Sequence, residues 1–359
     1  MSKGNFLNIQ WSILTPSIVL AVLGLTTLFS VNISFFKSQL IFLIISIFAY
    51  IFFCNVSYKI IQMYSLPIYI FSLIILSIVL ILGIESRGAM RWIDVFGIRV
   101  QFSELLKPFL AISFSFFLSK GNNSFKKFLQ AFLFLFPIVS LIFVQPDLGN
   151  AVIYAIVVLS VLIVVGFPYL WFVFGGIVSI VSFPLFWRFL HGYQKQRILT
   201  FFSPSNDPLG TSYNAIQSIV SVGSGMVSGK GLGEGTQSML RFLPERHTDF
   251  IFATFSEEFG LIGALVLILT FSFLLYKLYS VFENSNERFC KIFVVCSFFL
   301  ILVQFFVNIG MNIGILPVVG VTLPFVSYGG SSLLSNFILL GLVSSINSSL
   351  KSKNVLEIK

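Results

Sequence analysis

Long apolar runs constrain the fold of this chain more than any other feature of its sequence. A helix that crosses a bilayer needs about 20 mostly apolar residues. Only 10% of this 359-residue chain is charged, against about 25% in soluble domains. We therefore predict an all-α polytopic membrane protein that forms a single domain over residues 1–359. Its transmembrane helices, about ten in number, are expected near residues 11–31, 38–57, 63–84, 103–120, 127–145, 148–167, 169–189, 250–277, 289–310 and 331–350.

A long segment of mixed polarity, residues 190–249, separates the seventh and eighth predicted helices. Lys and Arg accumulate in the cytoplasmic loops of membrane proteins, so their distribution predicts the orientation. With a cytoplasmic N-terminus, eleven of the 22 Lys and Arg residues fall on the inner side and five on the outer side. We therefore expect both termini in the cytoplasm and the 190–249 loop outside. Ten of the 13 acidic residues then lie on the outer side, where we expect any chemistry to take place.

Net charge and cysteine content exclude several classes of protein. The net charge is +9, but the cations are scattered over loops and form no basic stripe, so we expect no nucleic-acid partner. Cys54, Cys290 and Cys296 lie within or beside apolar runs without a CxxC pair, which predicts neither a disulfide framework nor a zinc site. The first apolar run lacks a small-residue cleavage site and is expected to be a retained helix.

Glu104 and Lys107 are ionisable residues inside a predicted span. A charge at the centre of a span costs about 2.5–3.5 kcal/mol on insertion scales, so such residues usually have a function. At positions i and i+3 they share one helical face, and Ser103 is expected to cap that helix. The pair either binds substrate in a cavity open to the outer side or only neutralises itself, with Lys107 reaching outward. The residues just before, 91–94, are expected to form a short interfacial stretch.

The stretch "QPDLG", residues 145–149, places Asp147 at the start of the sixth predicted span. An aspartate at this position can cap free backbone N–H groups and complement the helix dipole. Its outer position beside the other acids favours a substrate-binding role equally well.

The stretch "GSGMVSGKGLGEGTQS", residues 223–238, only superficially resembles a phosphate-binding loop. The GxxxxGK[ST] pattern fails because Ser224 replaces its first glycine and Gly231 replaces its final Ser or Thr. Glycine-rich backbone with Lys230 can still bind a phosphate through its N–H groups. The alternative is that the segment is only a flexible turn.

The stretch "LPERHTDFIFATFSEEFG", residues 243–260, is unusually rich in ionisable groups for a membrane chain. Asp249 should lie at the outer start of the eighth span, where it can accept a proton or hold a divalent cation such as Mg or Mn. His247 with nearby acids suggests zinc, but no second histidine is close enough for a tight site. At least one of Glu257 and Glu258 must face the protein interior or water, because lipid would not accept it.

A run of small residues, "LPFVSYGGSSLLSNF" at 323–337, leads into the tenth predicted span. Small side chains let helices or a ligand approach closely. Ser327 and Ser331 are therefore candidate substrate-binding residues.

Five stretches together resemble the SEDS family, the RodA and FtsW peptidoglycan polymerases of bacteria. In order, they are "RGAMRWID…SELLK", "QPDLG", "GKGLGEGTQS", "FLPERHTDFIFA…EE" and "LPFVSYGGSSLL", which span about residues 85–345. "QPDLG" and "PERHTDF" are similar to the RodA branch. One departure is Phe102, where the family usually has proline in a Gln-Pro-Ser-Glu motif; here a proline follows later, at Pro108.

The resemblance implies a SEDS-type helical bundle that polymerises lipid II on the outer face of the bacterial inner membrane, during elongation and shape maintenance. The implied substrates are lipid II and a glycan chain on undecaprenyl pyrophosphate, within membrane lipid and without a nucleotide. A class B penicillin-binding protein is the implied partner. Asp249 matches the acid regarded as catalytic, and Glu104, Lys107 and Asp147 match polar residues of the central cavity.

Other residues are candidates on chemical grounds. A departing pyrophosphate needs compensating cations. The candidates are Arg197, Lys230, Arg241, Arg246 and Lys107, and His247 is a further candidate for binding substrate. Two other functions remain open: a flippase or transporter of a lipid-linked wall precursor, and a division-type polymerase of the FtsW kind. Acids gathered on one side fit an enzyme better than a carrier, which needs polar groups at mid-membrane that are accessible from both sides.

Overall fold

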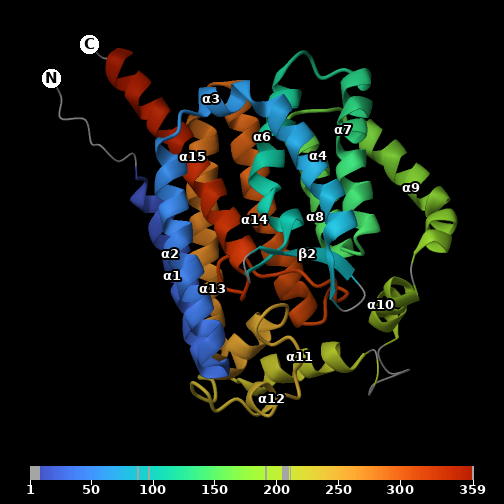
Figure 1. Ribbon diagram of the computed structural model, residues 1–359, viewed down its shortest axis with the longest axis vertical. Helices are drawn as coiled ribbons and strands as arrows, with labels where there is room; N and C mark the ends of the chain where they lie inside the picture. The colour runs from blue at the N-terminus through green and yellow to red at the C-terminus, as the bar shows by residue number, and fades with distance from the viewer. Residues whose placement is uncertain are drawn as a thin grey trace.

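The computed structural model describes residues 9–86, 89–95, 98–190, 192–203, 210 and 212–357. In these ranges the chain forms a bundle of long helices with a small β-sheet (Figure 1). The helices are α1 (Trp11–Val31), α2 (Ile33–Asn55), α3 (Tyr58–Met63), α4 (Ser65–Leu82), α5 (Phe102–Leu105), α6 (Lys107–Ser119), α7 (Phe125–Val144), α8 (Leu148–Val164), α9 (Tyr169–Phe189), α10 (Gly192–Phe202), α11 (Tyr213–Ser224), α12 (Thr236–Met239), α13 (Ile251–Asn284), α14 (Arg288–Asn312) and α15 (Gly330–Glu357).

Ten apolar helices in the described part of the chain coincide with the ten predicted spans. Seven of them, α1, α2, α4, α7, α13, α14 and α15, are long and apolar enough to cross a membrane, and α6, α8 and α9 are shorter. The prediction of an all-α multi-pass membrane protein is therefore confirmed. The described residues between the seventh and eighth spans form three further helices, α10, α11 and α12. In Figure 1, α11 and α12 lie below the bundle and α10 lies to its lower right. We call this end of the bundle the loop end.

The central helices of the bundle are α14 and α15. In their most apolar windows, 67% and 72% of the residues are buried, against 22% for α4, so the outer helices present most of their surface to lipid. α15 packs along α2, and α1 packs along α13. Gly24 on α1 permits a close approach, because a Cβ there would lie 2.3 Å from the carbonyl oxygen of Val326.

The fourth predicted helix, 103–120, is two helices in the structure, and one expectation about it is wrong. The break falls at Leu106, and Pro108 occupies the first turn of α6. Backbone N–H groups in the first turn have no helical partner, so proline costs no hydrogen bond there. Ser103 was expected to cap this helix but lies inside α5, whose N-cap is Gln101. Its hydroxyl donates to Asp147 instead, at 2.7 Å.

The expected interfacial stretch is part of a three-stranded antiparallel sheet at the loop end. Its strands are β1 (Ile84–Ser86), β2 (Ala89–Val95) and β3 (Ile98–Val100), in the order β1-β2-β3. Asp94 of β2 is paired in register with Arg99 of β3. Helix predominates in the rest of the described chain, so this sheet does not change its fold class.

α13 is interrupted at Gly260, whose φ of 65° and ψ of −163° are not helical. A helix break leaves backbone donors and acceptors without helical partners, and here the glycine-rich segment after α11 supplies them. Its carbonyls accept from the residues after the break, and its N–H groups donate to the residues before it. These bonds are Leu261 N to Met226 O (2.9 Å), Ile262 N to Val227 O (3.1 Å), Lys230 N to Glu257 O (3.0 Å) and Gly231 N to Glu258 O (3.1 Å).

Candidate functional site

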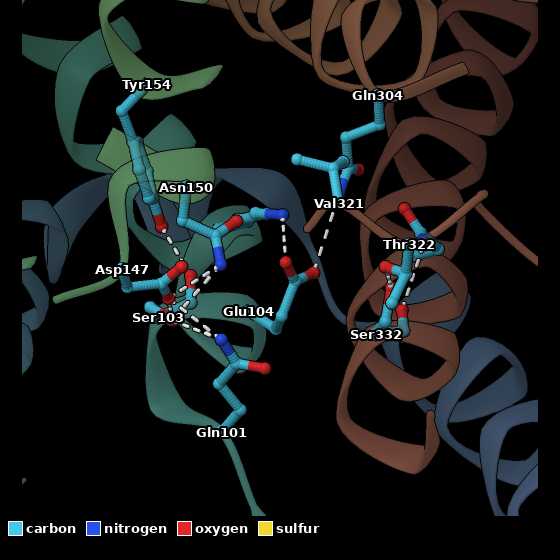
Figure 2. Close-up of polar contacts among 12 residues, drawn as sticks. Gln101, Ser103, Glu104, Asp147, Asn150, Tyr154, Gln304, Val321, Thr322 and Ser332 are labelled. Atoms are coloured by element: carbon cyan, nitrogen blue, oxygen red, sulfur yellow. Dashed lines mark hydrogen bonds and ion pairs between the residues drawn. The ribbon is translucent and has the colours of Figure 1, made fainter. Parts of the chain in front are cut away.

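Asp147 is the centre of a buried polar cluster between α5 and α8. It stands at the N-cap position of α8, as predicted, but its side chain makes no capping bond. Its Oδ2 accepts instead from Ser103 Oγ (2.7 Å), Gln101 Nε2 (2.8 Å) and Asn150 Nδ2 (2.9 Å). Figure 2 shows these side chains converging on the carboxylate, which is only 1% exposed. On the sheet side, Arg91 of β2 forms an ion pair with Asp147 Oδ1 at 3.6 Å.

Glu104 and Lys107 form the ion pair that their spacing predicts. Lys107 Nζ lies 2.7 Å from Glu104 Oε1, and the two residues are 3% and 5% exposed. The second carboxylate oxygen of Glu104 accepts a longer bond from Gln304 Nε2 of α14, at 3.4 Å (Figure 2). Burial of two charges is tolerated when they are paired and hydrogen-bonded, as here.

A cavity of about 30 Å³ borders the ammonium side of this pair, between α6, α7, α8 and α14. Apart from Lys107 and Tyr154, apolar and sulfur-bearing side chains line it. The Tyr154 hydroxyl donates to the Ser103 carbonyl at 3.0 Å, which joins this wall to the Asp147 cluster.

Ser331 connects the cluster to the segment before α15. Its hydroxyl accepts from the backbone N–H of Gln101 at 3.0 Å, and the residue is 7% exposed. Next to it, the hydroxyls of Thr322 and Ser332 share a hydrogen bond of 3.0 Å (Figure 2). The predicted site residue Ser331 is therefore connected to Asp147 through Gln101.

Asp249 lies two residues before the start of α13, at the predicted end of that helix, and is partly exposed. Gly320, in the segment between α14 and α15, lies directly against it. A Cβ at Gly320 would lie 3.4 Å from Asp249 Oδ2 and 3.9 Å from Arg197 Nη1 of α10. The structure thus brings together the carboxylate of a partly exposed residue and a guanidinium that lie far apart in the sequence.

His247 and Ser327 border the same place. The His247 ring stacks on Phe35 of α2, with centroids 4.3 Å apart and an interplanar angle of 10°, and lies 5.7 Å from the ring of Tyr328. Ser327 is buried, and its hydroxyl donates to the Thr248 carbonyl at 2.7 Å. Ser327 therefore fixes the chain next to Asp249 by a backbone contact.

Two other predicted cations, Lys230 and Arg246, have partners within the loop end. Lys230 Nζ forms an ion pair with Glu257 Oε1 at 3.0 Å. Arg246 Nη1 donates to the Ser238 carbonyl. Burial, and next the neighbouring Arg241 charge, lowers the pKa of the Arg246 guanidinium from its usual value.

Glu257 organises the glycine-rich segment. It is fully buried and accepts from Gln237 N (2.9 Å), Ser238 N (2.9 Å) and Ser238 Oγ (2.8 Å), as well as from Lys230. Glu258, 1% exposed, accepts from Gly233 N at 3.1 Å and from the Ser30 hydroxyl. Both acids face protein, as the cost of a charge in lipid requires. The segment's N–H groups are engaged with α13, so the observed geometry favours a structural turn over a phosphate cradle.

A divalent cation at Asp249 would need further ligands besides this carboxylate. Within the described ranges, no three His, Cys, Asp or Glu side chains are grouped so as to hold a metal ion. Mg²⁺ is commonly held by one or two carboxylates together with substrate phosphates. The protein residues alone do not complete such a site, so a cation here would need oxygens from a substrate.

Several polar residues of the site were missed in the sequence. Gln304, Asn308 and Asn312 of α14 are each 0% exposed and recur at intervals of four. Polar residues at this spacing inside an apolar helix mark one buried face, which is a readable signal. Gln39 of α2, whose amide donates to the Ser327 carbonyl at 3.1 Å and accepts from Gly329 N at 3.1 Å, had no such signal.

Comparison with known sequences gives consistent matches. A family model described as cell cycle protein, of the FtsW, RodA and SpoVE type, matches residues 8–352. The peptidoglycan glycosyltransferase MrdB of Escherichia coli (strain K12) is 40% identical over 295 residues, covering 80% of this chain and 79% of MrdB. The probable peptidoglycan glycosyltransferase FtsW of Buchnera aphidicola subsp. Baizongia pistaciae is 34% identical over 329 residues, covering 89% of this chain and 86% of that protein.

Solved structures show the same architecture. One similar chain comes from a peptidoglycan synthase complex, in a study of the structural coordination of polymerization and crosslinking. It superposes on this chain with a TM-score of 0.83 and 27% sequence identity. The match covers 95% of this chain and 98% of that chain. The rod shape determining protein RodA of Thermus thermophilus gives a TM-score of 0.73 at 24% identity, covering 96% and 98% of the two chains. At that identity the second match shows the fold alone.

Proposed function

Because this chain belongs to the family of FtsW, RodA and SpoVE cell cycle proteins, we infer that it is a peptidoglycan glycosyltransferase, the activity by which its MrdB and FtsW relatives are named. Its role is glycan-strand polymerisation in cell-wall elongation, which the higher identity to MrdB supports over the division-type alternative. We propose lipid II as the monomer, added to a glycan chain carried on undecaprenyl pyrophosphate. Lipid-linked substrates suit an enzyme whose outer helices face lipid.

The observation that carries the mechanism is the accessibility of Asp249. Glu104, Asp147, Glu257 and Glu258 are at most 5% exposed, whereas Asp249 is partly exposed beside Arg197. A general base must be able to reach the hydroxyl whose proton it removes, and side chains that are at most 5% exposed are too deeply buried to meet a substrate hydroxyl. Asp249 is therefore the proposed base.

In the proposed step, the 4-hydroxyl oxygen of the acceptor sugar attacks the anomeric carbon of the donor chain. A carbon–oxygen bond forms there, the bond from that carbon to the pyrophosphate oxygen breaks, and the configuration inverts. The hydroxyl proton passes to the Asp249 carboxylate and later to water. No nucleotide is required, because the pyrophosphate link of the donor is already activated.

Arg197 is the proposed cation for the departing pyrophosphate. It lies beside Asp249, because its Nη1 and Asp249 Oδ2 both border Gly320. Cations fixed where negative charge develops stabilise the transition state. A divalent cation such as Mg or Mn would supply the same charge compensation if the pyrophosphate brought it to Asp249.

The remaining predicted binding residues are assigned different roles according to how exposed they are. His247 borders Asp249 and is proposed to contact substrate. Glu104, Lys107 and Asp147 lie deeper, so we propose that they shape the floor of the site, which Ser331 joins to the segment before α15. Ser327 and Arg246 contribute by holding the backbone near Asp249 and the loop end.

We propose that the loop end faces outward, with both termini in the cytoplasm. The distribution of Lys and Arg supports this orientation, with eleven on the terminal side and five on the opposite side. A class B penicillin-binding protein, a transpeptidase with one membrane anchor, is the proposed partner. The similarity to a chain of a peptidoglycan synthase complex supports this pairing.

The test is polymerisation of lipid II by the purified full-length protein. Asp249→Asn preserves the shape of the side chain but removes the proton acceptor, so we expect the rate to fall by roughly 10²–10⁴-fold. Asp94→Asn is the matched control, an exposed acid on β2 at the same end of the molecule, and should polymerise at the wild-type rate. A folded Asp249→Asn protein with wild-type activity would show that Asp249 is not the base.

A further inference from the structure

A ladder of buried amides runs along one face of α14. Gln304, Asn308 and Asn312 follow one another at one-turn intervals, and none is exposed. Gln304 points to Glu104 of the buried cluster, at 3.4 Å. The other two reach the chain that carries Asp249, so this face of α14 connects the buried cluster with the proposed base.

Asn308 binds two separate segments with one amide nitrogen. Its Nδ2 donates to the carbonyl oxygen of Asp249 at 3.0 Å and to that of Val321 at 2.7 Å. A side-chain amide has two N–H donors, so these two bonds use both. Val321 follows Gly320, which lies against the Asp249 carboxylate. Asn308 thus fixes both the backbone of Asp249 and the segment that flanks its side chain.

Asn312 binds the same carbonyl from the next turn. Its Nδ2 donates to Asp249 O at 3.0 Å, and its Oδ1 accepts from Ala253 N, in the first turn of α13, at 3.1 Å. The Ser218 hydroxyl of α11 donates to the Asn312 carbonyl at 2.9 Å. Asn312 therefore joins α11, α14 and the start of α13 around Asp249.

The three carbonyls before Asp249 are held in the same way. Thr254 Oγ1 donates to Arg246 O (3.1 Å), Tyr328 N donates to His247 O (2.9 Å), and Ser327 Oγ donates to Thr248 O (2.7 Å). Four consecutive carbonyls are thus hydrogen-bonded to groups outside their own segment, and the fourth receives two bonds. This leaves the backbone of Asp249 little freedom to turn.

We propose that Asn308 and Asn312 are positioning residues of the glycosyl transfer, which hold the Asp249 carboxylate in register with the acceptor hydroxyl without touching substrate. The inference rests on the proposed function of Asp249. A displacement of about 1 Å in a reacting group can cost on the order of 10²-fold in rate. Loss of either amide should therefore slow the chemical step and leave substrate binding unchanged.

The experiment uses Asn308→Ala and Asn312→Ala in the full-length protein, with its transpeptidase partner present. Steady-state polymerisation of lipid II should show kcat reduced by roughly tenfold to 10²-fold and KM within about twofold of wild type. Asn308→Gln and Asn312→Gln retain an amide donor and should give kcat values between those of the alanine variants and wild type. Ser297→Ala is the control on α14, because its buried hydroxyl donates to Phe293 O within the same helix. Its kcat and KM should equal wild type.

The outcomes separate positioning from stability and from binding. Rates are normalised to the amount of monodisperse protein, so that loss of folded protein does not count as loss of kcat. If Asn308→Ala or Asn312→Ala has the same kcat as the Ser297→Ala control, the inference is overturned. A raised KM at unchanged kcat also overturns it, because the amides would then belong to substrate binding. If the alanine variants do not fold, the glutamine variants decide, and wild-type kcat in both overturns the proposal. Asp249→Asn is measured in parallel. Full activity of Asp249→Asn defeats the proposed role of Asp249 as the base, on which this inference rests. An inactive Asp249→Asn together with fully active variants at Asn308 and Asn312 defeats only the positioning role.

Discussion

Asp147 and Asp249 both lie at the start of a helix, yet they differ in burial and in the way they are held. Three hydrogen bonds reach Asp147 Oδ2, an arginine reaches Oδ1, and the residue is 1% exposed. Asp249 is anchored by its backbone carbonyl, and the residue is partly exposed. A deeply buried carboxylate stabilises the fold, whereas a partly exposed one can meet a substrate.

The Glu104–Lys107 pair leads to a prediction about stability. Removing one partner leaves the other charge buried without compensation, which costs about 3–5 kcal/mol, whereas removing both can be nearly neutral. Glu104→Gln and Lys107→Met should each lower the apparent melting temperature in detergent more than the double variant does. The non-additivity should correspond to about 0.5–3 kcal/mol.

The control for that cycle is a pair of residues without mutual contact. Ser297 lies on another helix, α14, and its described hydrogen bond is to Phe293 O of the same helix. Glu104→Gln and Ser297→Ala should therefore lower the melting temperature additively when they are combined. Additive losses for Glu104 and Lys107 as well would show that the 2.7 Å ion pair contributes no coupling.

At the scale of elements, the glycine-rich segment and α13 form one unit. The segment supplies backbone partners at the Gly260 break, and Glu257 binds its far end. Gly225 and Gly229 allow this contact, because a Cβ at either would lie about 2 Å from a carbonyl oxygen of α13, at 1.9 and 2.1 Å. Gly225 and Gly229 therefore serve close backbone approach to α13.

A matched pair of alanine substitutions tests this role. Gly229 and Gly233 have similar positive φ values, 80° and 76°, so alanine costs each about the same backbone strain, roughly 1 kcal/mol. A Cβ at Gly233 meets its nearest atom at 3.9 Å, whereas one at Gly229 clashes with Glu258 O. Gly229→Ala should therefore lower the melting temperature and the yield in membranes far more than Gly233→Ala. Equal losses would mean that the close approach to α13 does not stabilise the protein.

The sequence predicts these elements unevenly, for physical reasons. The ten spans were predictable because apolar length is a local property of the chain. The Glu104–Lys107 contact was predicted from the i, i+3 spacing and forms even though the two residues lie in α5 and α6, on either side of the break at Leu106. The Ser103 cap was predicted wrongly, since Asp147 offers its hydroxyl a charged acceptor from another helix. The convergence of Gly320 and Arg197 on Asp249 involves three distant segments, and no local pattern encodes it.

At the scale of the whole molecule, α9 stands apart from the other spans. It diverges from the bundle in Figure 1, and none of its described side chains is buried. At its start, Trp171 and Phe172 pack against Phe128 of α7, with ring centroids 5.4 and 5.2 Å apart. α10, which carries Arg197, follows α9 directly, so the position of α9 affects where this cation lies relative to Asp249.

The loop end is also connected to Asp249 through the interior, which leads to a prediction about the partner. α11 contacts Asn312 through Ser218, and Asn312 binds the Asp249 carbonyl. A protein that binds the loop end can therefore shift the position of the proposed base through these two hydrogen bonds. A partner that favours the active arrangement shifts the population toward it. Allosteric coupling of about 1–3 kcal/mol corresponds to roughly 5–150-fold, so the membrane-anchored transpeptidase should raise the polymerisation rate within that range.

The measurement is a titration of the transpeptidase, with its membrane anchor, into a lipid II polymerisation assay in proteoliposomes. Ser218→Ala removes the hydroxyl that joins α11 to Asn312, so this variant should bind the partner normally but show a smaller stimulation. Ser224→Ala is the control on the same helix, since its hydroxyl donates to Ser221 O at 3.0 Å and makes only a long contact of 3.4 Å with Glu257. A rate that stays flat at saturating partner, with complex formation verified by co-purification, would rule out activation and leave co-localisation as the partner's contribution.

Equal stimulation of wild type and Ser218→Ala would support activation by the partner but exclude the path through Asn312. The effect of the partner would then reach Asp249 by another contact of the loop end.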